Sequence, residues 1–100
     1  MVKLQVKKLR TLKDKSLGLI GQKKAYPIML ETRFGIHTLG LNFSIDVLIL
    51  DTQKRVVVLK ESLSPFRIFL WNPRFKIVLE MPIGTIKKYN IKRGTEILLR

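Results

Sequence analysis

Two runs of aliphatic residues, separated by five polar residues, constrain the fold of this chain more than any other feature. The runs are Val47–Leu50 and Val56–Leu59, and the polar segment between them, residues 51–55, has the length of a hairpin loop. Short continuous apolar runs are typical of strands that are buried on both faces. The sequence therefore predicts an antiparallel hairpin within the core.

Further strand-like segments lie on both sides of this hairpin. Val2, Leu4 and Val6 alternate with polar residues, which predicts a first strand with one buried face, and residues 28–30 and 96–99 predict two more. Two aromatic and aliphatic segments, residues 66–71 and 75–79, are separated by the turn signal Asn72-Pro73-Arg74 and predict a second hairpin.

Short helices are predicted at two places. Asp14 can cap a helix that carries Leu17 and Ile20 on one side and ends at Gly21. A second helix is expected to begin at Gly84-Thr85, with Thr85 as its N-cap and Asn90 as a left-handed stop. The predicted fold is α+β and mainly β, a small closed or nearly closed β-barrel with one or two short helices, and residues 1–100 form a single domain.

The charge of the chain favours an anionic partner. Twenty basic residues against seven acidic ones give a net charge of +13. Nucleic acid, acidic lipid headgroups, phosphorylated metabolites and anionic polysaccharide all fit such a field, and a merely solubilising role fits as well. The basic clusters are Lys3, Lys7, Lys8, Arg10, Lys13 and Lys15, then Lys23 and Lys24, then Lys87, Lys88, Lys92 and Arg93.

Several classes of site and location are disfavoured. The chain has no cysteine, which excludes disulfides and thiolate zinc sites, and its single histidine makes a metal centre unexpected. No cofactor is predicted. The N-terminus alternates apolar and charged residues, unlike a secretory signal, and no segment reaches the length of a transmembrane helix, so we expect a soluble, cytoplasmic protein. The sequence does not determine the oligomeric state.

The single histidine, His37, precedes an apolar turn, and Asp46 follows it. An antiparallel turn centred between Leu41 and Asn42 would place His37 opposite Asp46, close enough for an imidazole–carboxylate hydrogen bond. Such a pair can orient a general base, but no nucleophile signature accompanies it. We therefore expect a structural pair at a buried turn, and no catalytic residue is assigned.

A second group of candidates lies in the segment LEMPIGT, residues 79–85. A helix that starts at Gly84-Thr85 presents free backbone N–H groups, and Lys87 and Lys88 follow, so this segment is a candidate anion site. The simpler interpretation is an ordinary capped helix, or one whose free N–H groups are met by Glu80. A candidate polar site would join the residues His37, Thr38, Asp46, Glu80 and Thr85.

Aromatic residues around Arg67 are candidates for stacking on nucleic-acid bases. Alternation along a strand places Phe69 and Trp71 on the face of Arg67, opposite the face of Phe66, Ile68 and Leu70. A buried strand or a partner-binding edge is the preferred interpretation, because large apolar side chains usually lie inside.

The order of these segments resembles the family known as domain of unknown function 192, also called UPF0127. The resemblance runs from about Leu17 to the C-terminus and rests on the segments GLI, IHTLGLNFSIDVLILD, VLEMPIGT and YNIKRGTEI. Leu41 and Ser44 depart from the methionine and proline usual in the family. The resemblance implies a compact small-barrel domain and no established reaction, cofactor or ligand.

The favoured function is accordingly a non-enzymatic binding or accessory module for an anionic ligand or partner. Two alternatives remain from other classes. One is a nucleic-acid-binding module, and the other is a small hydrolase or lyase that uses His37 with Asp46. The observation that best separates the three hypotheses is whether a concave polar pocket joins the residues His37, Thr38, Asp46, Glu80 and Thr85.

Overall fold

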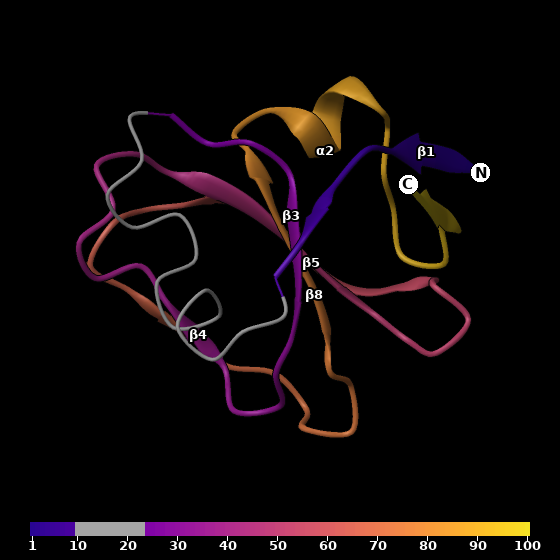
Figure 1. Cartoon of the computed structure of the whole chain (residues 1–100), viewed down its shortest axis with the longest axis horizontal. Coiled ribbons are helices and arrows are strands. Elements are labelled where there is room, and N and C mark those ends of the chain that lie inside the picture. The colour runs from indigo at the N-terminus through magenta and orange to yellow at the C-terminus, as the bar shows by residue number, and fades with distance from the viewer. Residues whose placement is uncertain (10–23) are drawn as a thin grey trace.

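The computed structural model describes residues 1–9 and 24–100, and the chain over these residues is mainly β (Figure 1). The helix predicted to begin at Asp14 lies outside the described residues. The described elements are β1 (Val2–Leu4), β2 (Lys7–Lys8), β3 (Ile28–Glu31), β4 (Ile36–His37), β5 (Ile45–Leu50), β6 (Val56–Leu63), β7 (Ile68–Phe69), β8 (Ile77–Pro82), α2 (Thr85–Lys88) and β9 (Ile97–Leu99).

A five-stranded sheet with the order β2-β3-β8-β5-β6 forms the centre of the molecule. Strands β5 and β6 pair antiparallel from Leu50 opposite Val56 to Ile45 opposite Leu63, so the predicted hairpin is confirmed. The register shifts between Ile45 and Val47, where β6 contains extra residues opposite Asp46. This irregularity lies beside one of the candidate site residues.

The second predicted hairpin is wrong. The turn at Asn72 is present, because the Asn72 Oδ1 accepts a hydrogen bond of 3.0 Å from the Arg74 N–H. The strands on its two sides have different partners: β7 pairs with β4, whereas β8 lies between β3 and β5. Strand β8 is buried along residues 77–81, because β3 and β5 pair with both of its edges and its side chains enter the cores on both faces of the sheet.

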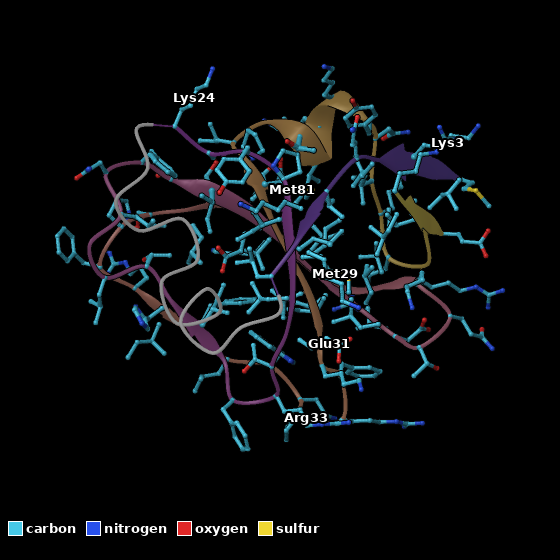
Figure 2. The ribbon with its side chains drawn as sticks, in the orientation of Figure 1. Lys3, Lys24, Met29, Glu31, Arg33 and Met81 are labelled. Atoms are coloured by element: carbon cyan, nitrogen blue, oxygen red, sulfur yellow. The ribbon has the colours of Figure 1, made fainter. Side chains whose placement is uncertain are left out.

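Two hydrophobic cores cover the two faces of the five-stranded sheet. Successive side chains of a strand point to opposite faces, so Leu48 and Leu50 of β5 join one core while Val47 and Ile49 join the other. The core that contains Ile86 of α2 is called here the α2-side core, and the core that contains Ile36 of β4 the β4-side core. In Figure 2, Met29 and Met81, both of the α2-side core, lie at the centre of the molecule.

Two smaller pairs of strands complete the described fold. The terminal strands β1 and β9 pair in parallel, and β4 pairs antiparallel with β7 (Figure 1). No described sheet closes on itself, so the barrel remains a prediction. Within residues 1–9 and 24–100, no helix has the length and apolar content needed to cross a membrane.

The short helix α2 forms where the sequence predicts it, but its cap differs. Its N-cap is Gly84, in a left-handed conformation with a φ of 91°, and no side chain caps the helix. The Thr85 hydroxyl instead donates a hydrogen bond of 2.6 Å to the Pro82 carbonyl oxygen. The predicted role of Thr85 as N-cap is therefore wrong, whereas Asn90 has the predicted left-handed backbone, with a φ of 52°.

Candidate functional site

Asp46 lies on β5 and is fully buried. Its Oδ1 accepts a hydrogen bond of 3.0 Å from the Ser62 N–H on β6, and its Oδ2 accepts one of 3.0 Å from the Ile86 N–H on α2. The irregular register of β6 leaves the Ser62 N–H free to point at the carboxylate rather than into the ladder. Asp46 thus joins a strand, a bulge and a helix through its two oxygens.

His37 does not face Asp46, and the predicted pair is wrong. His37 is exposed on β4 and lies opposite Ile68 of β7, whereas Asp46 lies opposite Met81 of β8. The turn between the two segments is not a simple antiparallel hairpin, because β4 leaves the central sheet and pairs with β7 instead. The hydrolase or lyase hypothesis loses the pair on which it depended.

Glu80 is buried on the face of the sheet opposite to Asp46. It lies in register with Val47 and Ile28, which belong to the β4-side core, whereas the partner of Asp46, Met81, belongs to the α2-side core. Burial raises the pKa of the Glu80 carboxyl to about 7, because an apolar environment disfavours its charged form. The sheet therefore separates the two carboxyl groups.

The two threonines of the candidate polar site also have structural partners. The Thr38 hydroxyl donates a hydrogen bond of 2.7 Å to the Ser64 carbonyl oxygen and accepts one of 2.8 Å from the Arg67 N–H. Thr85 lies near Asp46 because it is the first residue of α2 and the N–H of the next residue, Ile86, donates to Asp46. The structure thus brings Asp46 and Thr85 together and holds His37, Thr38 and Glu80 elsewhere. Among the described residues, no group of three or more His, Cys, Asp or Glu side chains is arranged to hold a metal ion.

The start of α2 already holds an anion, which is the carboxylate of Asp46. The Ile86 N–H in the first turn donates to Asp46 Oδ2, and α2 is only four residues long. One N–H group at the start of α2, that of Ile86, is therefore already used within the chain, and anion binding at the backbone of Gly84 and Thr85 stays a prediction. Of the two lysines predicted to assist it, Lys88 lines a neighbouring pocket and Lys87 does not.

This neighbouring pocket, called here the lysine pocket, is a shallow hollow of about 490 Å³ between β1 and α2. Its charged lining side chains are Lys3 and Lys88, and Lys88 Nζ lies 5.4 Å from the centre of the Tyr89 ring. Ile83 and Tyr89 give it an exposed apolar wall. The full lining is Lys3, Leu4, Gln5, Pro27, Pro82, Ile83, Gly84, Thr85, Lys88 and Tyr89.

A second pocket of about 490 Å³ has a less favourable electrostatic lining for an anion. It contains Arg33, Arg74 and Lys76, but also Asp51. The Arg33 guanidinium donates to the carbonyl oxygens of Pro73 and Arg74, and Lys76 forms an ion pair with Glu31 at 3.3 Å. Several of its cationic groups therefore already have partners within the protein.

Sequence reasoning found one side of the lysine pocket and missed the other. The segment at residues 84–88 was identified from its helix start, but Lys3 lies more than 80 positions away on β1. The parallel pairing of β1 with β9 brings Lys3 to this end of the molecule (Figure 2). No local pattern in the sequence signals that contact.

The alternation predicted for residues 66–71 is present, but the exposed face is the other one. Phe66, Ile68 and Leu70 are exposed, whereas Phe69 and Trp71 are half-buried against the β4-side core. The rings of Phe69 and Trp71 lie 6.0 Å apart, and the Trp71 indole N–H donates to the Phe75 carbonyl oxygen at 2.7 Å. Of the three aromatic residues in this segment, Phe69 and Trp71 thus pack against the core, and only Phe66 has an exposed ring.

Comparison with solved structures supports the fold. The model superposes on a protein of unknown function from Novosphingobium aromaticivorans DSM 12444 with a TM-score of 0.78 and 15% identity, covering 89% of this chain and 70% of the other. A second structure, from Sinorhizobium meliloti 1021, gives a TM-score of 0.74 at 15% identity, covering 89% and 76%. At such identities the likeness concerns the fold alone.

Sequence comparison gives the family. A UPF0127 protein of Pyrococcus abyssi is 34% identical over 77% of this chain and 67% of its own length, and one of Pyrococcus horikoshii is 34% identical over 83% and 76%. A UPF0127 protein of Thermococcus sibiricus is 38% identical over 67% of this chain, which spans only 44% of that relative. The family model DUF192, described as "Uncharacterized ACR, COG1430", matches residues 2–99. The chain therefore belongs to the DUF192 (UPF0127) family.

Proposed function

We propose that this domain is a non-enzymatic binding module that holds a small anionic ligand in the lysine pocket. The observation that carries the proposal is the lining of that pocket, whose charged side chains are Lys3 and Lys88. The two come from opposite ends of the chain and meet across one hollow. A ligand with an anionic group between them gains two charge-assisted hydrogen bonds.

The apolar wall of the pocket suggests the rest of the ligand. Ile83 and Tyr89 are large apolar side chains that remain exposed beside the two ammonium groups. An aromatic or aliphatic group attached to the anion would cover them and remove their surface from water. We infer a ligand class of organic phosphates or carboxylates with an apolar substituent, bound at a shallow and partly solvated site.

Titration with two probes that differ in one group tests this proposal. Inorganic phosphate and phenyl phosphate are added separately to the ¹⁵N-labelled protein, and backbone amide shifts are followed by NMR. We expect saturable shifts at residues 3–5 and 83–89, and tighter binding of phenyl phosphate because its ring covers Tyr89. Affinity in the micromolar to millimolar range is expected, since both lysines are exposed and their charges are screened by water.

A charge-matched pair of variants separates a site from a general electrostatic effect. Lys3→Gln/Lys88→Gln removes two charges from the pocket, and Lys54→Gln/Lys60→Gln removes two from β6 and the turn before it. The first should weaken phenyl phosphate binding by about tenfold, and the second should leave it nearly unchanged. Equal weakening of phenyl phosphate binding in both variants, or amide shift changes spread over the whole surface, would contradict the proposal.

A further inference from the structure

The paired strands β4 and β7 form a two-stranded ribbon whose outer face is apolar. Ile36 lies opposite Phe69 and His37 opposite Ile68. Hydrogen bonds extend the ribbon, from the Thr38 N–H to the Arg67 carbonyl oxygen at 2.8 Å and from the Phe66 N–H to the Thr38 carbonyl oxygen at 3.1 Å.

The register determines which side chains share the outer face. Continuing the pairing beyond Ile36 and Phe69 places Gly35 beside Leu70. At the other end the register shifts, because the Phe66 N–H donates to the Thr38 carbonyl oxygen and the Arg67 N–H donates to the Thr38 hydroxyl, so that both residues lie opposite Thr38. The close approach of Gly35 to Leu70 agrees, because a methyl group added at Gly35 would overlap the Leu70 side chain. We call the set His37, Leu39, Phe66, Ile68 and Leu70 the ribbon face.

The ribbon face is exposed to an unusual degree for apolar residues. Phe66 and Ile68 each have a relative exposure of 70%, and Leu70 of 68%. The opposite face of the same ribbon carries Ile36 and Thr38, which are buried. Isolated exposed apolar residues are common, but a contiguous set on one face marks an interaction surface.

The backbone at Phe66 supports the same interpretation. Its φ of 60° is a left-handed conformation that bulky residues rarely adopt. This conformation costs free energy, and the Phe66 side chain nevertheless lies in water rather than in the core. The side chain is thus held outward at a conformational cost.

The charges around the ribbon face select the class of partner. The two segments that build it, residues 36–39 and 66–70, contain Arg67 and no acidic residue. A second copy of this chain, with its own net charge of +13, would be repelled. An anionic partner is favoured.

The chemistry of the face favours lipid over nucleic acid or protein. Three of its four apolar side chains are aliphatic, and they offer no ring on which a base could stack. The imidazole of His37 is its one polar side-chain group, whereas protein interfaces carry many hydrogen bonds. Aliphatic side chains with a phenyl ring, next to the exposed Arg67, fit the boundary between headgroups and acyl chains.

We propose that the ribbon face is a membrane-contact surface. Leu39, Phe66, Ile68 and Leu70 enter the acyl boundary of an anionic bilayer to a shallow depth, and Arg67 meets a lipid phosphate. Figure 1 shows β4 far from β1 and α2, and no residue of the ribbon face lines the lysine pocket, so the two surfaces are separate. Vesicle binding and binding of the small anion are therefore independent.

Vesicle partition of the full chain tests the proposal. Vesicles of phosphatidylcholine alone are compared with vesicles of equal parts phosphatidylcholine and phosphatidylglycerol, using co-sedimentation. Trp71, the single tryptophan of the chain, packs against the β4-side core next to Leu70 and serves as the energy donor to a dansyl-labelled lipid in the vesicles. We expect binding to the anionic vesicles, with energy transfer from Trp71 to the labelled lipid.

Two variants separate insertion from attraction by the net charge. Ile68→Ser/Leu70→Ser changes exposed side chains and leaves the charge intact, and Leu98→Ser on β9 is the control. The double variant should lose about tenfold in partition, with a matching loss of energy transfer from Trp71, while the control binds like the wild type. Thermal melting verifies that all three chains are folded.

Three results would overturn the proposal. The double variant could partition like the wild type, which would leave only electrostatic attraction. Sedimentation could instead show a dimer of the wild type that the double variant abolishes, which would make the face a self-interface. Loss of oligonucleotide binding in the double variant, without loss of vesicle binding, would assign the face to nucleic acid.

Discussion

Glu80 carries its carboxyl group on a strand in the middle of the sheet, in register with Ile28 and Val47. Only 6% of the residue is exposed, and burial raises the pKa of its carboxyl from 4.5 to about 7. In the unfolded chain the carboxyl ionises first as pH rises, whereas in the folded protein it stays protonated until near neutrality. The protonated form therefore favours the folded state, and this contribution is lost between pH 4.5 and about 7.

Replacing Glu80 with glutamine should remove this pH dependence. The variant keeps the size of the side chain but has no charge to bury. The free energy of unfolding of Glu80→Gln, relative to wild type, should rise by about 3 kcal/mol between pH 4 and pH 8, because the shift from 4.5 to about 7 spans about two and a half pK units. Urea unfolding of both chains at several pH values measures the difference, and a difference that is constant with pH would contradict the assignment.

For a single polar residue, the sequence can predict that it is buried, but it cannot predict its hydrogen-bond partners. A polar residue inside an apolar segment, such as Asp46 before Val47–Leu50, predicts a buried group that needs hydrogen bonds. Its actual donors are the backbone N–H groups of Ser62 and Ile86, 16 and 40 positions away. Every residue except proline carries such a donor, so no residue type identifies the partner. The chemistry of histidine favours His37 as a partner, but the strand register places His37 opposite Ile68 and Asp46 opposite Met81.

For strands, the sequence predicts the pairing correctly where the two partners are close together in the chain. The β5–β6 hairpin joins neighbouring runs through a short polar loop. The pairings of β4 with β7 and of β3 with β8 join segments more than 30 residues apart. For β8 the adjacent candidate, β7, is less favourable than the two distant strands β3 and β5, because pairing with these places β8 in the centre of the sheet, between the two cores.

Asp46 connects β6 and α2 through its two hydrogen bonds, and replacing it should weaken both contacts. Asp46→Asn leaves one acceptor oxygen and places an NH₂ group against a backbone N–H donor. We expect the free energy of unfolding to fall by about 3 kcal/mol, with loss of hydrogen-exchange protection at the Ser62 and Ile86 amides. Chemical denaturation and exchange followed by NMR measure the two effects.

Asp51→Asn is the matched control. Asp51 also accepts two backbone hydrogen bonds, from Gln53 and Arg55, but both reach its Oδ1. An asparagine oxygen can accept both, so this variant should stay within about 1 kcal/mol of wild type. Equal losses in the two variants would show that removing a negative charge from a basic protein, rather than the geometry at Asp46, sets the effect.

For the whole molecule, the net charge of +13 and the two surfaces act at different ranges. The field extends about one Debye length from the protein and attracts any polyanion. The lysine pocket and the ribbon face act only on contact, and the fold creates both by joining distant segments. Composition thus predicts attraction to anions, whereas the location and shape of each surface require the three-dimensional fold.

Attraction by the field alone makes a specific prediction for nucleic acid. A single-stranded oligonucleotide should bind weakly at low salt, and its affinity should fall about 300-fold between about 50 and 200 mM salt if about six phosphates are contacted. Base composition should have little effect, because release of counterions carries no sequence information. Fluorescence anisotropy of labelled oligonucleotides over a salt series measures both quantities.

The two charge-matched double variants decide whether this binding has a site. Lys3→Gln/Lys88→Gln and Lys54→Gln/Lys60→Gln each lower the net charge from +13 to +11, since each removes two positive charges. If the field dominates, both variants should lose similar affinity and a similar part of the salt slope. A much larger loss in the first variant would place the nucleic acid at the lysine pocket. A complete absence of binding at low salt would show that the positive field alone, without a matching surface, does not hold a nucleic acid to this domain.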